Sequence, residues 1–213
     1  MARTRILLAD DHVMFIEGLR KLLGLKFEIV GVIANGRDVI PAAERLHPDV
    51  VVVDISMPLL NGIEAARRIS ELPHAPKTVF LTMHEDPTFA AAALQAGASG
   101  YVLKRSKPAE IITAIQKAIR GGIYISPLLR CDLLTTLLEK HGQVQKLKPE
   151  LTLRQREILQ QLAEGKSPKE IGAILNISAK TVEYHKYRIM NATGVRTIAE
   201  LTRYAIAHGI VQP

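Results

Sequence analysis

The first 120 residues alternate short apolar segments with longer segments of helical periodicity, and this alternation limits the folds open to the chain. Five segments rich in Val and Ile predict strands at 5–9, 28–33, 50–53, 78–81 and 100–103. Helices are predicted between and after them, at about 12–25, 37–46, 62–71, 86–96 and 108–120. Such alternation is typical of a parallel sheet covered by helices on both faces. The expected fold class is therefore α/β, with a doubly wound sheet.

The pattern changes after Gly121 and Gly122. Residues 127–140 carry leucines at helical spacing and predict a possible helix, whereas residues 141–150 (HGQVQKLKPE) have little to bury. From Leu151 onward only helical patterns occur, and four helices are expected at about 153–164, 168–175, 179–191 and 197–208. We therefore expect a first domain at 1–122, a linker at 123–148 and an all-α domain at 149–213.

Composition narrows the class of protein. The chain has 213 residues, of which 47% are hydrophobic and 23% charged, as in ordinary globular proteins. Its net charge of +7 is uneven, because residues 148–213 hold 10 Lys and Arg against 6 Asp and Glu. A basic domain permits a polyanionic partner such as DNA. Cys131 is the single cysteine, and neither a signal-peptide core nor an apolar run long enough for a membrane is present. We expect a cytoplasmic protein that contacts no membrane.

Acidic side chains follow two of the predicted strands. Asp10 and Asp11 come directly after the first strand, and Asp54 follows the third. In a sheet of strand order 2-1-3-4-5 these strands are neighbours, and such sheets bind ligands at the carboxyl ends of their strands. Converging carboxylates repel one another unless a cation joins them, and their oxygens suit Mg²⁺. Thr82 and Lys104 end the fourth and fifth strands at the same edge.

Each acid by itself is equally consistent with the N-cap of a following helix, but the joint pattern over four strand ends favours a site. With Met57-Pro58, Gly62 and Gly97-Ala98 before GYVLK, it resembles the receiver domain of bacterial two-component response regulators over residues 3–121. The resemblance implies a flavodoxin-like (βα)5 fold and Asp54 as the phosphoacceptor. A carboxylate can form an aspartyl-phosphate, and Mg²⁺ and a lysine can neutralise the charge on the transferred group.

The resemblance also implies the roles of the neighbouring residues. It implies a Mg²⁺ ion held by Asp10, Asp11, Asp54 and the backbone carbonyl of Ser56, with Lys104 paired to the phosphoryl group. Thr82 and Tyr101 are expected to form a switch that alters the face of the fourth helix, fifth strand and fifth helix. A phosphatase of the haloacid-dehalogenase type would need an acid where Ser56 stands, so we expect a phosphorylated switch and not an enzyme.

The C-terminal segment has well-marked helix boundaries. Thr152 with Gln155, and Ser167 with Glu170, have the spacing of capping boxes, and Ser178 can cap a third helix. Two short helices joined by a tight turn form a helix-turn-helix, whose second helix enters the major groove of DNA.

This segment resembles the LuxR-type helix-turn-helix of the NarL/FixJ class of response regulators over residues 150–213, through LTLRQREIL, KEIGAILNIS, TVEYH and GVRTIAEL. Its lysines and arginines are expected to meet phosphates, and Glu183 and Tyr184 to meet base edges. Val182 and Ile189 are expected in the core, and His185 could face either way. The residues expected to face DNA are Lys180, Thr181, Glu183, Tyr184, Lys186, Tyr187 and Arg188.

Two residues depart from the pattern of that class. Thr193 stands where a large apolar residue is usual, and Gly172 stands where alanine is usual. A glycine inside a helix costs up to about 1 kcal/mol relative to alanine. Both residues are therefore expected to weaken the second domain.

The sequence as a whole predicts a transcription regulator that is phosphorylated by a histidine kinase and binds paired DNA half-sites as a homodimer. An alternative is a DNA-binding protein whose first domain is an interaction module that works without phosphorylation. The intact set of Asp10, Asp11, Asp54, Thr82 and Lys104 argues against this alternative. A phosphatase that attacks through Asp54 is the remote third possibility.

Overall fold

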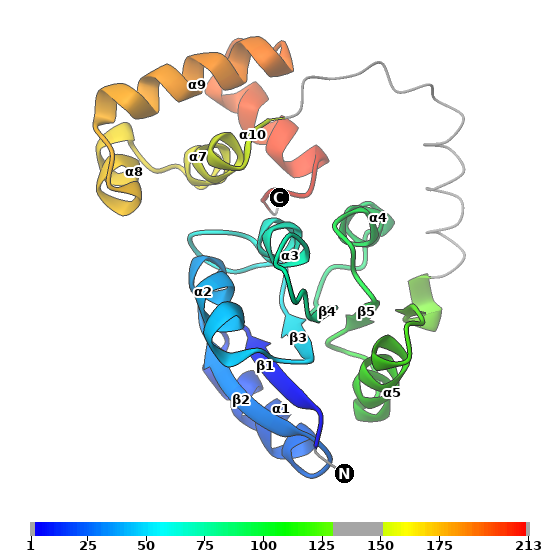
Figure 1. Cartoon of the computed structure of the whole chain (residues 1–213). Coiled ribbons are helices and arrows are strands. Elements are labelled where there is room, and N and C mark those ends of the chain that lie inside the picture. Colours follow the sequence, from blue (N-terminus) through cyan, green and yellow to red (C-terminus); the bar gives the residue numbers. More distant parts are fainter. Residues whose placement is uncertain (1–2, 130–150, 212–213) are drawn as a thin grey trace. The chain divides into compact units, whose positions relative to one another are not determined.

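A computed structural model describes residues 3–129 and 151–211 of the chain. The chain divides into two compact units, Met1–Leu138 and Glu139–Pro213. Figure 1 shows a sheet surrounded by helices in the first unit and helices alone in the second. This confirms the expected fold class.

The first unit contains one parallel sheet of six strands in the order β2-β1-β3-β4-β5-β6. The predicted order 2-1-3-4-5 is confirmed, and the short strand β6 adds to it. The strands are β1 (Arg5–Ala9), β2 (Glu28–Ile33), β3 (Val50–Val53), β4 (Lys77–Thr82), β5 (Gly100–Leu103) and β6 (Tyr124–Ile125). The helices are α1 (Val13–Gly24), α2 (Gly36–Leu46), α3 (Gly62–Ser70), α4 (Pro87–Gln95), α5 (Pro108–Ile119) and the 3-10 helix η1 (Pro127–Leu129).

Alternating side chains build a separate hydrophobic layer on each face of the sheet. Ile6 and Leu8 of β1 pack with α1 and α5, whereas Leu7 and Ala9 belong to the layer under α2, α3 and α4. All four valines of β3 are buried, because helices cover both faces of this strand. The uninterrupted valine run is therefore the consequence of a central position in the sheet.

The segment 124–129 extends the first unit beyond its expected end at residue 122. β6 pairs in parallel with β5, with Tyr124 opposite Gly100 and Ile125 opposite Tyr101. Leu129 at the end of η1 is buried in the layer under α3 and α4. A strand of two residues has no periodicity for a sequence to show. The remainder of the possible helix at 127–140 lies outside the described residues.

The second unit is all-α, with four helices in its described part. They are α7 (Leu153–Ala163), α8 (Pro168–Leu175), α9 (Ala179–Thr193) and α10 (Ile198–Ala207). The capping boxes at Thr152 and Ser167 are both present, and the Ser178 side chain accepts from the Thr181 N–H. Val182 and Ile189 are fully buried among the leucines and isoleucines of the other helices. These boundaries agree closely with the sequence analysis.

The two unusual residues of this unit each have a structural role. At Gly172 an added Cβ would lie 2.7 Å from the Ile177 carbonyl oxygen, and the Ile177 N–H donates to the Gly172 carbonyl at 3.0 Å. The glycine thus lets the turn approach α8 closely, which offsets part of its helix-propensity cost. The Thr193 hydroxyl donates to the Ile189 carbonyl at 2.8 Å, so it is satisfied within α9.

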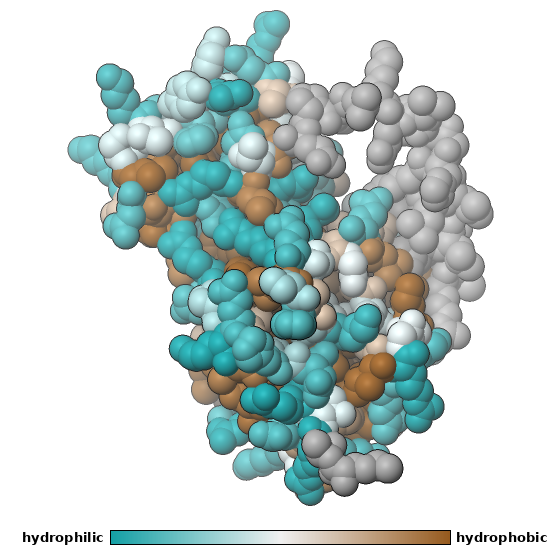
Figure 2. Space-filling view, in the orientation of Figure 1, coloured by the Kyte–Doolittle hydropathy of each residue, from teal (hydrophilic) through white to brown (hydrophobic). Residues whose placement is uncertain are grey.

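The surface visible in Figure 2 is mainly hydrophilic, with scattered apolar residues. Within residues 3–129 and 151–211, no helix has both the length and the apolar character that crossing a membrane requires.

Gly62 allows α3 to begin directly against the backbone that follows β3. An added Cβ would lie 2.0 Å from the Asp54 carbonyl oxygen, and neither backbone can move without repacking the sheet. Gly62→Ala is therefore expected to lower the free energy of unfolding by at least about 2 kcal/mol. Gly18→Ala is the control, because nothing lies within 4 Å of its added Cβ in α1, and it is expected to raise stability by up to about 1 kcal/mol. Urea unfolding of both variants measures the difference, and equal effects would contradict this account.

Candidate functional site

Lys104, the residue after β5, joins two carboxylates at the carboxyl edge of the sheet. Its Nζ lies 2.7 Å from Asp10 Oδ2 and 2.7 Å from Asp54 Oδ2. The Asp54 N–H donates to the Ala9 carbonyl at 2.9 Å, so the pairing of β1 and β3 continues to the point where both acids leave the sheet. The three side chains are at most 4% exposed, so solvent screens their attraction poorly.

The ammonium of Lys104 is held in its charged form by these neighbours. Burial by itself lowers its pKa, but the hydrogen bonds and charges of Asp10 and Asp54 outweigh burial and raise the pKa above the ordinary lysine value. The Phe15 ring lies 4.8 Å from Nζ and adds a cation–π contact. Because the folded pKa is raised, the stabilisation from this ammonium is fully present at neutral pH and is lost only in strongly alkaline solution.

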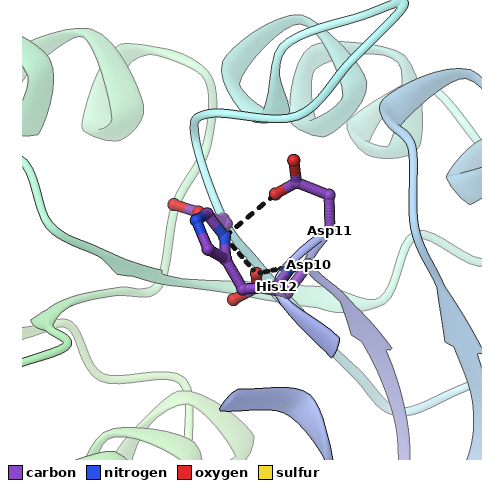
Figure 3. A group of neighbouring side chains, drawn as sticks. Asp10, Asp11 and His12 are labelled. Atoms are coloured by element: carbon purple, nitrogen blue, oxygen red, sulfur yellow. Dashed lines mark hydrogen bonds and ion pairs between the residues drawn. The ribbon is translucent and has the colours of Figure 1, made fainter. Parts of the chain in front are cut away.

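The His12 ring lies against both Asp10 and Asp11, as Figure 3 shows. Its Nδ1 lies 3.1 Å from Asp10 Oδ1 and 3.1 Å from Asp11 Oδ1, and its backbone N–H donates to Asp10 Oδ1 at 2.9 Å. The sequence analysis did not anticipate this residue. Its position directly after two strand-end acids is the signal that could have identified it.

The carboxylates are close enough to share a cation. One ligand atom each from Asp10, Asp11, His12 and Asp54 lie within 4.8 Å of one another. Three of these four groups are carboxylates, the ligands that Mg²⁺ prefers in proteins. The second Asp54 oxygen, Oδ1, accepts from the Ile55 N–H at 2.7 Å. The donor set present in the chain therefore fits Mg²⁺.

His84, in the loop between β4 and α4, contacts four neighbouring residues. Its Nε2 lies 2.8 Å from Ser56 Oγ, and its ring stacks on Phe89 with centroids 4.1 Å apart. Its N–H donates to the Thr82 hydroxyl at 3.3 Å, and its carbonyl accepts from the Tyr101 hydroxyl at 3.0 Å. Thr82 and Tyr101 are both fully buried and are both bonded to the backbone of this one residue.

Burial shifts the pKa of both His84 and the Tyr101 hydroxyl bonded to its carbonyl. Burial lowers the pKa of His84 below the ordinary histidine value, although the charges of Asp54 and Asp86 oppose this effect. Burial, reinforced by Asp54, raises the pKa of the Tyr101 hydroxyl well above its ordinary value. Tyr101 therefore remains a protonated donor to the His84 carbonyl at neutral pH.

The exposed face of α9 in the second unit carries aromatic and charged side chains. The Arg188 guanidinium donates to the Tyr184 hydroxyl at 3.2 Å, and Lys186 forms an ion pair with Glu183. Tyr184 and Tyr187 are 56% and 66% exposed, so this face presents two aromatic rings to solvent. Of the residues expected to face DNA, Lys180, Glu183, Tyr184, Tyr187 and Arg188 are exposed, and Thr181 and Lys186 are half-buried.

His185 lies at the border between this face and the core. It is half-buried, and burial together with the charges of Arg154 and Arg188 lowers its pKa below the ordinary value. The imidazole is therefore neutral at neutral pH.

Family models match both units. Residues 6–116 match the response regulator receiver domain, and residues 149–205 match the luxR family of bacterial regulatory proteins. Residues 1–5, 117–148 and 206–213 lie outside the two matches.

Whole-chain relatives have the same two parts in the same order. The transcriptional regulatory protein MctR of Rhizobium johnstonii is 34% identical over 212 residues, which cover 98% of this chain and 96% of MctR. The structure of the RcsB response regulator of Salmonella typhimurium is 27% identical, with a TM-score of 0.62 over 98% of this chain and 99% of that one. A structure of two RcsB dimers bound to two parallel DNAs has a TM-score of 0.58 and 27% identity, over 96% and 98% of the two chains.

Lys104→Met removes the cation that joins Asp10 and Asp54. We expect the free energy of unfolding to fall by about 3 kcal/mol, because the two buried carboxylates are left without their partner. Added Mg²⁺ should restore part of this loss, and it should stabilise the variant more than the unchanged chain. Lys77→Met is the control, because Lys77 is exposed at the start of β4. Urea unfolding with and without Mg²⁺ tests this, and an equal effect of Mg²⁺ on both variants would be evidence against a shared cation site.

Proposed function

Since the chain belongs to the bacterial response regulators that join a receiver domain to a LuxR-type DNA-binding domain, and is a DNA-binding transcriptional regulator, we propose that phosphorylation of Asp54 controls its binding to DNA. The phosphodonor is a sensor histidine kinase. The observation that carries this proposal is the Lys104 ammonium, shared at 2.7 Å between the buried carboxylates of Asp10 and Asp54.

Asp54 is the nucleophile in this proposal. One of its carboxylate oxygens forms a bond to phosphorus while the bond between phosphorus and the donor's histidine nitrogen breaks, and the released imidazole takes up a proton. Phosphoryl transfer needs mainly positioning and charge neutralisation. Lys104 supplies both, because its ammonium is already within hydrogen-bond distance of Asp54 and its contact with Asp10 limits its position.

Asp10, Asp11, Asp54 and the Ser56 backbone carbonyl would hold Mg²⁺ beside this carboxylate. The ion would supply positive charge for the oxygens of the transferred group. The chain's own residues prepare the site for it, because the Lys104 ammonium holds Asp10 and Asp54 together against their mutual repulsion, and His12 Nδ1 contacts Asp10 and Asp11. His12 then competes with the cation for Asp10 and Asp11.

The response to phosphorylation begins at Thr82 and Tyr101. A phosphoryl group brings about two negative charges to Asp54 and attracts the Thr82 hydroxyl, which in this structure accepts from the His84 N–H. If Thr82 turns toward the phosphoryl group, the His84 loop loses that contact, and the same loop holds the Tyr101 hydroxyl. The switch changes state because the phosphoryl group interacts better with one arrangement than with the other.

DNA is read by α9, the second helix of the helix-turn-helix. Lys180, Lys186 and Arg188 meet phosphates, and Glu183 and Tyr184 meet base edges in the major groove. Glu183 pairs with Lys186, and Tyr184 pairs with Arg188. When α9 enters the major groove, each pair either separates to contact DNA or contacts DNA while still paired. Phosphorylated chains form homodimers on half-sites about one helical turn apart. The RcsB dimers on DNA support this arrangement.

Asp54→Asn tests phosphorylation directly. After incubation with acetyl phosphate and Mg²⁺, intact-mass measurement should show one added phosphoryl group on the unchanged chain and none on the variant. DNA affinity should rise at least about tenfold for the unchanged chain alone, which corresponds to about 1.4 kcal/mol. Asp38→Asn, at an exposed position in the first turn of α2, is the control and should behave like the unchanged chain. Identical DNA binding before and after phosphorylation would favour the phosphorylation-independent interaction module.

Substitutions on α9 separate phosphate contacts from base contacts. Lys180→Ala should weaken binding to all duplexes alike and reduce the slope of log affinity against log salt by about 0.9, because one counterion fewer is released. Glu183→Ala should change the relative preference among duplexes by about 1–3 kcal/mol without reducing that slope. Titrations at several salt concentrations with two duplex sequences measure both. The reverse pattern would show that the two roles are misassigned.

A further inference from the structure

Ser126, directly after β6, is the centre of a buried hydrogen-bond network. Its hydroxyl donates to Glu110 Oε2 at 3.0 Å and lies 3.1 Å from the Ser106 hydroxyl. The Leu103 N–H donates to Ser126 Oγ at 3.4 Å, and the Tyr124 hydroxyl donates to Glu110 Oε2 at 3.0 Å. Ser126 is fully buried, so these protein groups take the place of water.

The direction of the network follows from the number of protons. A serine hydroxyl has one proton to donate, and that of Ser126 goes to the Glu110 carboxylate. Ser106 must therefore donate to Ser126 and cannot accept from it. Hydrogen bonds to a carboxylate are about twice as strong as those between neutral groups. The Glu110 carboxylate thus fixes the direction of both hydrogen bonds: Ser106 donates to Ser126, and Ser126 donates to Glu110.

The network holds the backbone on both sides of Lys104. Leu103 precedes Lys104 and Ser106 follows it by two residues, and both contact the Ser126 hydroxyl. The Ser126 N–H also donates to the Tyr101 carbonyl at 2.9 Å. Across the sheet, the Lys104 N–H donates to the Thr82 carbonyl at 2.7 Å. The loop that carries the ammonium is therefore fixed by β4 on one side and by β6 on the other.

We infer that Ser126, ordered by Glu110, is a positioning residue that couples Lys104 to the segment 124–129 and so to the chain that leads to the DNA-binding domain. The inference rests on the proposed phosphorylation of Asp54. A phosphoryl group places new oxygens beyond the Asp54 carboxylate, and the ammonium must change its contacts to reach them. The loop around Lys104 then moves. If its hydrogen bonds to Ser126 persist, β6 moves with the loop, and if they break, β6 loses these contacts.

β6 is well suited to respond to such a movement. It has two residues, lies at the edge of the sheet and pairs with β5 alone among the described strands. A long central strand is held by many hydrogen bonds to two neighbours. The position of β6 therefore depends more strongly on the hydrogen bonds of one side chain, Ser126. Leu129, three residues after Ser126, is buried in the layer under α3 and α4, so a shift of β6 also reaches that layer. The segment 124–129 is therefore part of the switch and not only the start of a linker.

The test measures coupling and not stability. A duplex is first selected from random DNA with the full chain phosphorylated by acetyl phosphate, and its affinity is then measured with and without phosphorylation. Ser126→Ala should reduce the ratio of the two affinities at least threefold at equal, mass-verified phosphorylation. Ser126→Thr keeps the hydroxyl and should preserve the ratio. Ser106→Ala cuts only the link to the loop, at a half-buried surface position, and should act in the same direction if Ser126→Ala folds poorly.

Thr113→Ala is the matched control, because its hydroxyl donates to the Ala109 carbonyl within α5 at 2.9 Å and it is exposed. It should leave the affinity ratio unchanged. The inference is overturned if Ser126→Ala and Ser106→Ala keep the full ratio, or if Thr113→Ala lowers it equally. If the unchanged chain takes up no phosphoryl group, or binds DNA equally in both states, the proposed function itself fails and the inference fails with it.

Discussion

The first unit is organised around one ammonium shared by two buried carboxylates. Asp10 and Asp54 leave adjacent strands, and their negative charges would repel each other in a site that water screens poorly. Lys104 comes from β5, with β4 between β5 and β3, so its side chain must cross a strand to reach both acids. The ammonium can therefore meet both carboxylates only when the four strands β1, β3, β4 and β5 are in register. The same arrangement leaves the charge balance of the pocket sensitive to any group added to Asp54.

Two further residues connect this pocket to its surroundings. His84 bonds to Ser56, Thr82 and Tyr101, and stacks on Phe89 in the first turn of α4, so it links the loop after β4 to the loop after β3, to β5 and to α4. Ser126 contacts the Leu103 N–H and the Ser106 hydroxyl, and so links the loop after β5 to β6. Both connections consist of hydrogen bonds in a region of low solvent exposure, where a lost partner is costly. A change at Asp54 is for this reason unlike a change at a surface carboxylate, whose effects solvent would absorb.

In the second unit, α9 packs one face into the core and leaves its other face exposed to solvent. Val182 and Ile189 fix α9 to the core, and the tight approach at Gly172 sets the turn before it. Two pairs of side chains on this helix are already bonded to one another, Glu183 with Lys186 and Tyr184 with Arg188. In the proposed function, DNA binding exchanges these internal pairs for contacts with phosphates and bases.

Local patterns allowed the sequence to predict the elements and the strand-end residues, whereas the strand order, and with it their convergence, was taken from the expected fold class. Val50–Val53, the capping boxes at Thr152 and Ser167, and the acids at 10, 11 and 54 each carry a pattern within a few positions. The tertiary structure alone decided β6, the contacts of His84 and the network at Ser126. These depend on pairs such as Ser56 with His84, 28 positions apart, and Ser106 with Ser126, 20 positions apart. A polar residue shows no periodicity that identifies its partner, so only the folded backbone can bring the two together.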